Sequence, residues 1–368
     1  MRITDVTVEC YQARFDPPIS NGKYTYETHD RCVVRVHTDV GLTGIGLGDG
    51  GTGVRGAPRM IAATVESLQP ALIGEDPLDH ERIWASMWVP KLIGRRGFTT
   101  RVISAIDIAL WDLKGKICGL PVAKLLGAHS AKLPAYLAGG YYEPGKDLAG
   151  LAAEMESYVA LGARAVKMKI GAVAIREDVE RVRAVRAAIG GDVKLLVDAN
   201  NAYRVHEAIE IARKLEQLDV FWLEEPVMPD DYRGLAQVAA SSPIPVASGE
   251  NEYTRYGFRD LVEHGHAAIL NPDAMFVGGV TEWLKVAAFA QAYDLPVAPH
   301  GIQEIHVHLA TAVPNGLLVE YYRHSNDAIS QRSFLEPLPL VDGFVSPPVR
   351  PGFGIELDEE ALAPYRVL

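Results

Sequence analysis

Two lysines, Lys167 and Lys169, lie two positions apart within the apolar stretch A-V-K-M-K-I. In a β-strand successive side chains point to opposite faces, so both ammonium groups would project from the same face. Two like charges held a few ångströms apart disfavour double protonation, which is one way to obtain a neutral lysine that acts as a base. An edge strand with two solvated lysines would explain the same stretch, so other residues must decide between the two interpretations.

Three carboxylates follow, each at the end of a short apolar run and 26 residues from the next: Asp198 in V-D-A-N, Glu224 in L-E-E-P and Glu250 in S-G-E-N. Carboxylates that converge in a closed space repel one another unless a cation neutralises them, and oxygen ligands with open positions suit Mg²⁺. Salt bridges with nearby basic residues would account for any one of the three. Three carboxylates in register instead predict a Mg²⁺ site.

An aspartate and a histidine end the next two apolar runs. Asp273 in N-P-D-A and His300 in A-P-H-G would be neighbours, and the aspartate could then fix the tautomer and orientation of the imidazole. Glu320, in V-E-Y-Y, ends the run after that. Lys169 and His300 would face each other across the metal site, which is the layout needed to move a proton on either face of a carbon acid. Four other histidines are interpreted as structural: His264, His266, His306 and His308.

The elements that would position these residues alternate from about residue 131 onward. Short apolar runs are separated by amphipathic helical patterns such as 176–189 and 205–218. Eight strands separated by helices at this spacing predict a β/α barrel, whose functional side chains come from the C-terminal ends of the strands. The expected strands are 132–137, 165–170, 193–198, 220–224, 245–248, 267–271, 296–299 and 316–321.

The first part of the chain has a different, α+β pattern. Residues 3–13 alternate as a strand, and 31–48 predict a hairpin that turns at 39–41. The segment between them, 15–30, is rich in Pro, Asn and Gly and is expected to be a loop that acts as a lid. Helices are expected at 57–69, 79–88 and 99–118. The Pro- and Gly-rich tail, 323–368, is expected to return to this first part.

Composition limits the kind of partner. The chain has 368 residues, 48% hydrophobic and 23% charged, with a formal net charge of -11, as in ordinary soluble globular proteins. No Lys/Arg cluster offsets the acidic excess, so a nucleic-acid partner is not expected. Cys10, Cys32 and Cys118 form no C-x-x-C pair, which favours a reducing cytoplasm. We expect neither a signal peptide nor a membrane partner, because no apolar run approaches roughly 20 residues.

Together these residues resemble the enolase superfamily, and within it the mandelate racemase subgroup. The resemblance covers nearly the whole chain, with A-I-D-I-A-L-W-D-L-K-G-K at 105–116 followed by K-x-K, D-x-N, E-E-P, G-E-N, D and H-G at the expected strand ends. It implies a modified TIM barrel of the (β/α)7β type with an α+β capping domain formed by the N-terminal part and the C-terminal tail. The expected bounds are 1–125 for the capping domain, 126–322 for the barrel and 323–368 for the returning segment.

The resemblance also implies roles for the residues. Mg²⁺ would be held by Asp198, Glu224 and Glu250, and it would chelate the substrate carboxylate and stabilise the enediolate formed on loss of the α-proton. Lys169 would be one acid/base, and His300, paired with Asp273, would be the other. Lys167 would balance the carboxylate charge and lower the pKa of Lys169. Asn200 would contact the substrate, and Glu320 would form a hydrogen bond with the developing enediolate oxygen.

The expected reaction is dehydration of an acid sugar, an aldonate or aldarate, to a 2-keto-3-deoxy acid. Cycloisomerisation of a sugar-acid lactone or anhydro sugar acid is an alternative, since P-H-G-I-Q-E-I-H-V-H-L at 299–309 is somewhat similar to anhydro-sugar-acid cycloisomerases. Racemisation or epimerisation of an α-hydroxy acid is another. A homo-oligomer, dimer or octamer, is implied by the family. A Schiff-base aldolase would use Lys167 or Lys169 but has no use for three carboxylates, and a non-catalytic binding protein would need none of these groups.

Several candidates lie outside the expected barrel. Gly46, Gly48 and Gly51 match G-x-G-x-x-G, but no second parallel strand follows, so they are expected to form a mobile loop over the barrel mouth rather than a dinucleotide site. The segments 15–30 and 48–60 would select the substrate. Candidates for gripping its hydroxyls or distal carboxylate are Lys23, Tyr24, Arg95 and Arg96.

Overall fold

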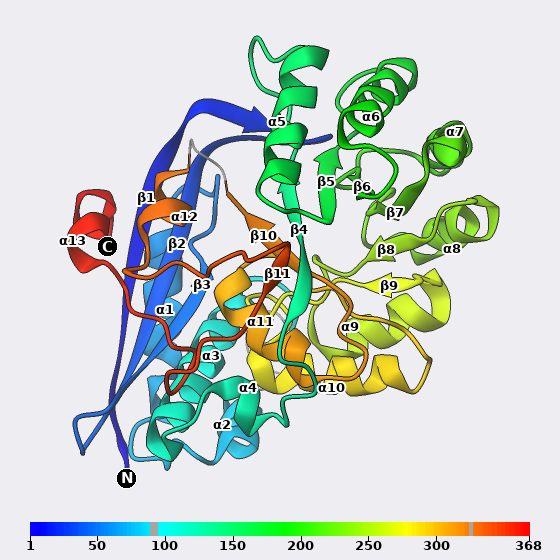
Figure 1. Ribbon diagram of the computed structural model, residues 1–368. Helices are drawn as coiled ribbons and strands as arrows, with labels where there is room; N and C mark the ends of the chain where they lie inside the picture. The colour runs from blue at the N-terminus through cyan, green and yellow to red at the C-terminus, as the bar shows by residue number, and fades with distance from the viewer. Residues whose placement is uncertain (89–94, 324–326) are drawn as a thin grey trace.

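The computed structural model describes residues 1–88, 95–323 and 327–368, which form two sheets with helices around them (Figure 1). The first sheet is antiparallel, with the strand order β1-β2-β3. Its strands are β1 (Ile3–Ser20), β2 (Thr25–Thr38) and β3 (Thr43–Asp49). Helices α1 (Ala57–Leu68), α2 (His80–Met87) and α3 (Phe98–Cys118) follow, close to the predicted bounds, and α4 (Val122–Leu125) leads towards the second sheet.

The segment 15–30 is not the loop that its composition predicts. β1 continues to Ser20 and β2 begins at Thr25, so only four residues form the tip of a long hairpin. The two consecutive prolines at 17 and 18 lie within a register shift between Arg14 and Ile19, where the strand skips its ladder pairing. Because proline cannot donate to a ladder, a bulge is where a strand accommodates it.

Gly46 and Gly48 lie inside β3, so the expectation that they form a mobile loop is wrong. A Cβ on Gly46 would lie 1.9 Å from the carbonyl oxygen of Ala105 in α3. The glycines therefore allow a helix to approach the sheet closely, a steric requirement that the motif pattern alone does not reveal. Gly51 follows the strand in a left-handed conformation, with a φ of 84°.

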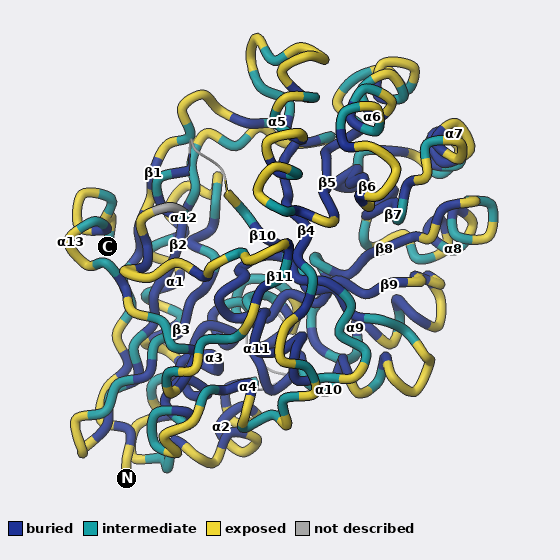
Figure 2. The backbone as a smooth tube through the Cα atoms, in the orientation of Figure 1, coloured by how far each residue is buried: buried dark blue, intermediate teal, exposed yellow. Residues whose placement is uncertain are grey.

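The second sheet is parallel and curls into a barrel, in the order β10-β4-β5-β6-β7-β8-β9 (Figure 1). Its strands are β4 (Leu133–Gly139), β5 (Ala165–Lys169), β6 (Lys194–Asp198), β7 (Val220–Glu224), β8 (Val246–Ser248), β9 (Ile269–Leu270) and β10 (Val319–Tyr322). The connecting helices are α5 (Leu148–Ala160), α6 (Ile175–Ile189), α7 (Val205–Leu215), α8 (Tyr232–Ser241), α9 (Thr254–Asp260), α10 (Gly279–Gln291) and α11 (Gln303–Ala312). Figure 2 shows the barrel strands buried and the outer helix faces exposed.

The predicted strand 296–299 is reduced to one residue. Val297 forms isolated parallel bridges with Leu270 and with Gly316, while the last strand begins at Val319 rather than at 316. Pro296 and Pro299 flank this bridge and have no N–H to donate, which explains why pairing does not extend. The bridge nevertheless closes the sheet, and the predicted (β/α)7β barrel with an α+β capping domain is confirmed.

Alternation along the barrel strands separates two environments. In β5, Val166 and Met168 belong to the large core beneath the helices, while the alternate residues Lys167 and Lys169 point into the barrel. The barrel interior is filled by a smaller apolar cluster around Tyr136 and Trp222, whose rings meet edge to face at 5.3 Å. This apolar layer supports the charged side chains at the strand ends.

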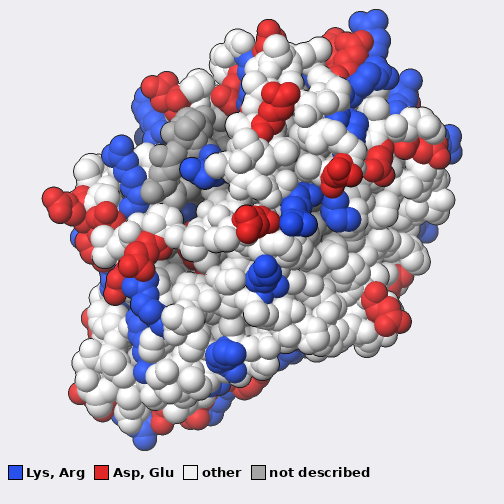
Figure 3. All heavy atoms as spheres, in the orientation of Figure 1, with Lys and Arg blue, Asp and Glu red and all other residues white. Residues whose placement is uncertain are grey.

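The C-terminal segment contacts both sheets. β11 (Phe344–Val345) pairs with β4, and α12 (Ala328–Arg332) and α13 (Glu359–Leu362) lie beside the antiparallel sheet (Figure 1). Near the end of the chain, the Val367 amide donates to the carbonyl of Cys10 in β1 at 2.8 Å. Within residues 1–88, 95–323 and 327–368, no helix combines the length and apolar character needed to cross a bilayer. On the face shown in Figure 3, acidic and basic side chains are interspersed among other residues.

Candidate active site

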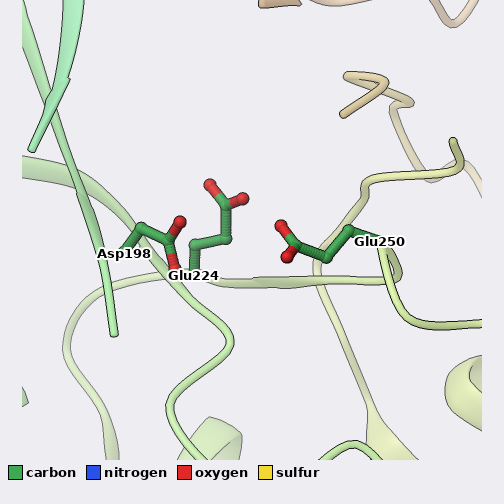
Figure 4. A group of neighbouring side chains, drawn as sticks. All are labelled: Asp198, Glu224 and Glu250. Atoms are coloured by element: carbon green, nitrogen blue, oxygen red, sulfur yellow. The ribbon is translucent and has the colours of Figure 1, made fainter. Parts of the chain in front are cut away.

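Three carboxylates converge at the C-terminal rim of the barrel. Asp198 and Glu224 end the paired strands β6 and β7, and Glu250 lies two residues beyond β8. One carboxylate oxygen from each lies within 4.8 Å of the others, and Figure 4 shows the three groups directed towards one another. Asp198 and Glu224 are fully buried, and the Glu250 side chain is 12% exposed. Among the described residues, Glu250 Oε2 has no hydrogen-bond partner. This set of hard oxygen donors fits a divalent cation such as Mg²⁺.

Lys167 is held among carboxylates at the base of the site. Its Nζ lies 2.9 Å from Glu224 Oε1, 2.7 Å from Glu320 Oε1 and 3.7 Å from Asp198 Oδ2. Burial alone would lower the pKa of Lys167, but Glu224 and Glu320 outweigh it and hold the pKa well above its ordinary value. Lys167 therefore stays charged and balances the acidic cluster.

Lys169 lies two residues after Lys167 in β5, closer to the rim, and is paired with a single carboxylate. Its Nζ lies 2.5 Å from Asp198 Oδ2 and 5.1 Å from the centre of the Tyr141 ring. Burial lowers the pKa of Lys169, but Asp198 and then Tyr141 raise it by more, so the pKa lies above its ordinary value. The Lys167 ammonium does act to lower it, yet the lowered pKa predicted from the sequence is wrong for this arrangement. In this arrangement the lysine is protonated, and its state is controlled by Asp198.

His300 faces the carboxylates from the opposite side. Its Nδ1 lies 2.9 Å from Asp273 Oδ2, and its Nε2 points towards Glu250 Oε2 at 3.6 Å. Burial opposes protonation, but Glu250 and Asp273 raise the pKa of His300 to about 10. The aspartate fixes the ring through Nδ1 and leaves Nε2 directed at the site. Lys169 and His300 thus lie at the two ends of the row formed by the three carboxylates.

Glu320 links the two halves of the site. Its Oε2 accepts the Gly301 amide at 2.7 Å, and its Oε1 forms the ion pair with Lys167. Burial would raise the pKa of Glu320, but Lys167 and His300 lower it to about 2. An ionised carboxylate cannot donate, so in this arrangement Glu320 positions Gly301 and Lys167 as an acceptor.

The three candidates for substrate contact are placed differently. Asn200 is buried beside the triad, and its backbone N–H donates to Asp198 Oδ1 at 2.8 Å. Lys23 and Tyr24 lie at the hairpin tip, where Lys23 Nζ lies 2.6 Å from Met228 Sδ and Tyr24 is 53% exposed. The structure therefore brings Asn200 to the triad but gives Lys23 and Tyr24 contacts at the outer edge.

Tyr26 is a residue that sequence reasoning missed. Its hydroxyl accepts a hydrogen bond from Asn21 Nδ2 at 2.9 Å, which leaves its own proton available to donate. Burial raises its pKa, and Glu250 and Asp198 add to the effect while Lys169 opposes it, so its hydroxyl lies within the field of the triad. The available signal was the strand-like alternation around Tyr24 and Tyr26, which was hidden by the turn-forming residues before it.

The hairpin tip is docked onto the barrel rim. Ser20 exchanges two backbone hydrogen bonds with Tyr142 in the loop after β4, at 2.8 and 2.9 Å. A Cβ on Gly22 would lie 2.6 Å from the carbonyl oxygens of Ile170 and Ala199, in the loops after β5 and β6. The capping domain therefore covers the lysine side of the site.

On the histidine side, Arg101 of α3 donates to Asp49 at 2.5 Å and to the Tyr253 hydroxyl at 2.9 Å. Its guanidinium stacks 4.0 Å from the Phe276 ring, which in turn lies 6.3 Å from His300. The two arginine candidates lie further out: Arg95 stacks over Trp88 at 5.1 Å and Arg96 pairs with Asp260 at 3.4 Å.

Two models of known protein families match most of the chain. The model for the mandelate racemase / muconate lactonizing enzyme N-terminal domain matches residues 3–127, and the model for the enolase C-terminal domain-like family matches 150–361. The chain is 38% identical over 330 residues to a 3,6-anhydro-alpha-L-galactonate cycloisomerase of Streptomyces coelicolor, spanning 89% of each chain. It is 36% identical over 318 residues to an arabinonate dehydratase of Saccharolobus solfataricus, spanning 84% of this chain and 85% of that one.

The likeness extends to solved structures. A racemase from Streptomyces coelicolor, crystallised with bound magnesium, matches with a TM-score of 0.92 and 35% identity over 99% of this chain and 100% of that one.

Proposed function

The chain belongs to the mandelate racemase / muconate lactonizing enzyme group of the enolase superfamily, and we propose that it removes the proton α to the carboxylate of an acid sugar and then breaks the C–O bond at the β-carbon. In the leading form of the proposal the leaving group is a hydroxyl, so an aldonate or aldarate is dehydrated to a 2-keto-3-deoxy acid. The observation that carries the proposal is the placement of Lys169 and His300 at the two ends of the carboxylate triad.

The proton-transfer groups have separate tasks. Lys169 Nζ, once free of its proton, takes the α-proton from one face of the substrate. His300, oriented by Asp273 through Nδ1, gives a proton from Nε2 to the departing oxygen or returns one to the enol on the other face. Lys167 keeps its charge and stabilises the negative charge that develops on the substrate.

Asp198, Glu224 and Glu250 fit the role of ligands for Mg²⁺, since they offer converging oxygen atoms and Glu250 Oε2 is buried without a hydrogen bond among the described residues. Mg²⁺ bound there would supply a Lewis acid for the substrate carboxylate and would compete with Lys169 for Asp198. Asn200 and Tyr26 then supply polar contacts from the barrel and the cap, and Glu320 holds Lys167 and the Gly301 amide in place.

Cycloisomerisation is the second candidate, favoured by the 38% identity to the anhydro-galactonate cycloisomerase. In a 3,6-anhydro sugar acid, the ring oxygen on the β-carbon would replace the hydroxyl as leaving group, and the same lysine and histidine would serve. Racemisation would need only the α-proton steps. The three reactions therefore share removal of the α-proton. Dehydration and cycloisomerisation differ in the leaving group at the β-carbon, and racemisation has none.

The test is a screen of sugar mono- and diacids, their lactones and anhydro forms, with Mg²⁺ in D₂O. Formation of a keto acid with loss of water supports dehydration, and a ring-opened product of unchanged mass apart from deuterium supports cycloisomerisation. α-Deuterium exchange with a new stereoisomer and no keto acid would mean epimerisation. Borohydride trapping of substrate on Lys167 or Lys169, with activity that survives EDTA, would replace the proposal with a Schiff-base aldolase.

The proposal extends to organisation. We propose that residues 1–125 and 323–368 form the capping domain and that residues 126–322 form the barrel. We further propose that the active enzyme is a dimer or an octamer and that it acts in the cytoplasm. The pairing of Cys10 with Val367, and of β11 with β4, supports a C-terminal segment that ties the cap to the barrel.

A further inference from the structure

A second set of side chains surrounds the carboxylate triad, and each member comes from one of the three loops that carry it. Glu225 follows Glu224, Asn251 follows Glu250, and Asn201 lies three residues after Asp198. Asn201 Nδ2 donates to Glu225 Oε2 at 3.0 Å. Asn251 Nδ2 donates to Glu225 Oε1 at 2.9 Å and to Oε2 at 3.0 Å. Glu225, 1% exposed, is therefore the one side chain in this set that contacts both of the others.

The backbone at these loops is held in an uncommon conformation. Asn200, Asn201 and Glu225 have φ values of 43°, 64° and 41°. Positive φ is costly for residues other than glycine and persists where the surrounding contacts over-determine it. The backbone N–H of Asn201 donates to the backbone carbonyl of Glu225 at 2.7 Å. The two loops are therefore connected by backbone as well as by side-chain hydrogen bonds.

Glutamate suits this position because both donors that reach it are amide Nδ2 groups. As the side chain lies, both oxygens of Glu225 accept hydrogen bonds from the two asparagines, whereas a glutamine would present an N–H₂ group to one of them. The loss would fall on a side chain that is 1% exposed, where an unpaired donor is costly.

We propose that Glu225 is a positioning residue that sets the spacing of Asp198, Glu224 and Glu250 through Asn201 and Asn251, and so tunes the affinity for a divalent cation. This inference rests on the proposed Mg²⁺ site. Glu225 acts through the loops and not on the substrate. Its removal should therefore loosen cation binding before it alters any chemical step.

The experiment measures Mg²⁺ binding to the full chain by calorimetry, without substrate, for the wild type and Glu225→Gln. We expect the variant to bind Mg²⁺ roughly 10- to 100-fold more weakly, the usual cost of losing an outer partner of metal ligands. Glu252→Gln is the matched control: Glu252 is a buried glutamate on the same loop as Glu250, but its partner is the Tyr232 hydroxyl at 2.7 Å. This control should keep wild-type affinity.

Asn251→Ala and the double variant with Glu225→Gln provide an independent arm if Glu225→Gln does not fold. Asn251→Ala alone should also weaken Mg²⁺ binding, and the double variant should lose little more than either single change, because both break the same contact. A wild type that binds no Mg²⁺ would overturn the proposed function itself. A wild type that binds, with Glu225→Gln and Asn251→Ala equally tight or with Glu252→Gln equally weak, would overturn only the positioning role.

Discussion

A Cβ placed on Gly22, at the tip of the capping hairpin, would lie 2.6 Å from the carbonyl oxygen of Ala199 in the loop that follows Asp198. Cap and barrel therefore meet at a point that has no room for a methyl group. Ala199 directly follows Asp198 in the chain, and Gly22 directly follows Asn21, which donates a hydrogen bond to Tyr26. The position of the cap and the shape of the site are consequently coupled through backbone contact.

Gly22→Ala should push the hairpin tip away from the rim and lower kcat/KM by about 10- to 100-fold, since an ångström of misplacement costs that much at a site of this kind. The unfolding temperature should change little, because the tip is remote from both cores. Gly191→Ala is the control, as a Cβ there meets nothing within 4 Å. Unchanged kinetics in Gly22→Ala would show that the cap does not need this contact.

Lys169→Met and His300→Asn should divide α-proton exchange by stereochemistry. Each variant should lose exchange with only one hand of a pair of substrate epimers, because the two groups lie at opposite ends of the triad. NMR of deuterium incorporation in D₂O measures this directly. Loss of exchange with both epimers in either variant would contradict separate roles.

Metal removal should stop turnover completely. EDTA treatment followed by dialysis should abolish activity, and added Mg²⁺ should restore it. Glu250→Gln should prevent that restoration while the far-UV circular dichroism stays unchanged, since Glu250 lies beyond the end of β8 and outside the apolar core. Activity that persists in EDTA would break the metal assignment.

Tyr26→Phe should reduce kcat/KM by about tenfold, because it removes one buried hydrogen bond from the Tyr26 hydroxyl to the anionic substrate. Tyr24→Phe, two residues earlier and 53% exposed, should behave as the wild type. Steady-state kinetics on the best substrate of the screen compares the pair. Equal losses in both variants would show that Tyr24 also contacts the substrate, as the sequence predicts.

Acid should weaken the fold through His80. Burial first, and then Lys114, lower the pKa of His80 to about 3 from an ordinary 6.5, and Asp79 opposes this only partly. The unfolded chain therefore binds a proton between these values that the folded chain does not, so stability is present above pH 6.5 and is lost as pH falls, at up to about 1.4 kcal/mol per pH unit.

His80→Phe, which keeps a ring against Trp111, should remove this part of the acid dependence. Urea unfolding at pH 7.5 and pH 5 should show the gap between variant and wild type shifting by about 1–2 kcal/mol in favour of the variant. The exposed His264 changed to Gln should leave the slope as it is. A parallel slope in wild type and His80→Phe would remove His80 from the explanation.

The sequence predicted the barrel and the triad because both depend on short-range patterns. Alternation around Lys167 and Lys169 and a constant spacing of the acidic strand ends are visible in the letters alone. Two features depend on partners elsewhere in the chain and were not visible: the effect of Asp198 on the pKa of Lys169, and the close approach of α3 to Gly46. Tyr26 was missed for the same reason, since its environment is made by the barrel. The extended hairpin pairs locally, but its Pro, Asn and Gly residues are typical of a loop and concealed it.

The single-residue bridge at Val297 makes the strand pairing around the barrel uneven. Lys169 ends β5, and β5, β6 and β7 each run for five residues. His300 instead follows Val297, a single residue that bridges to Leu270 on one side and to Gly316 on the other. Amide exchange should be fastest at this bridge among the barrel strands, because few ladder bonds protect it. A different leaving group would change the geometry on the side of His300. The sparse pairing beside His300 allows that side to adjust while Lys169, which removes the proton, keeps its position.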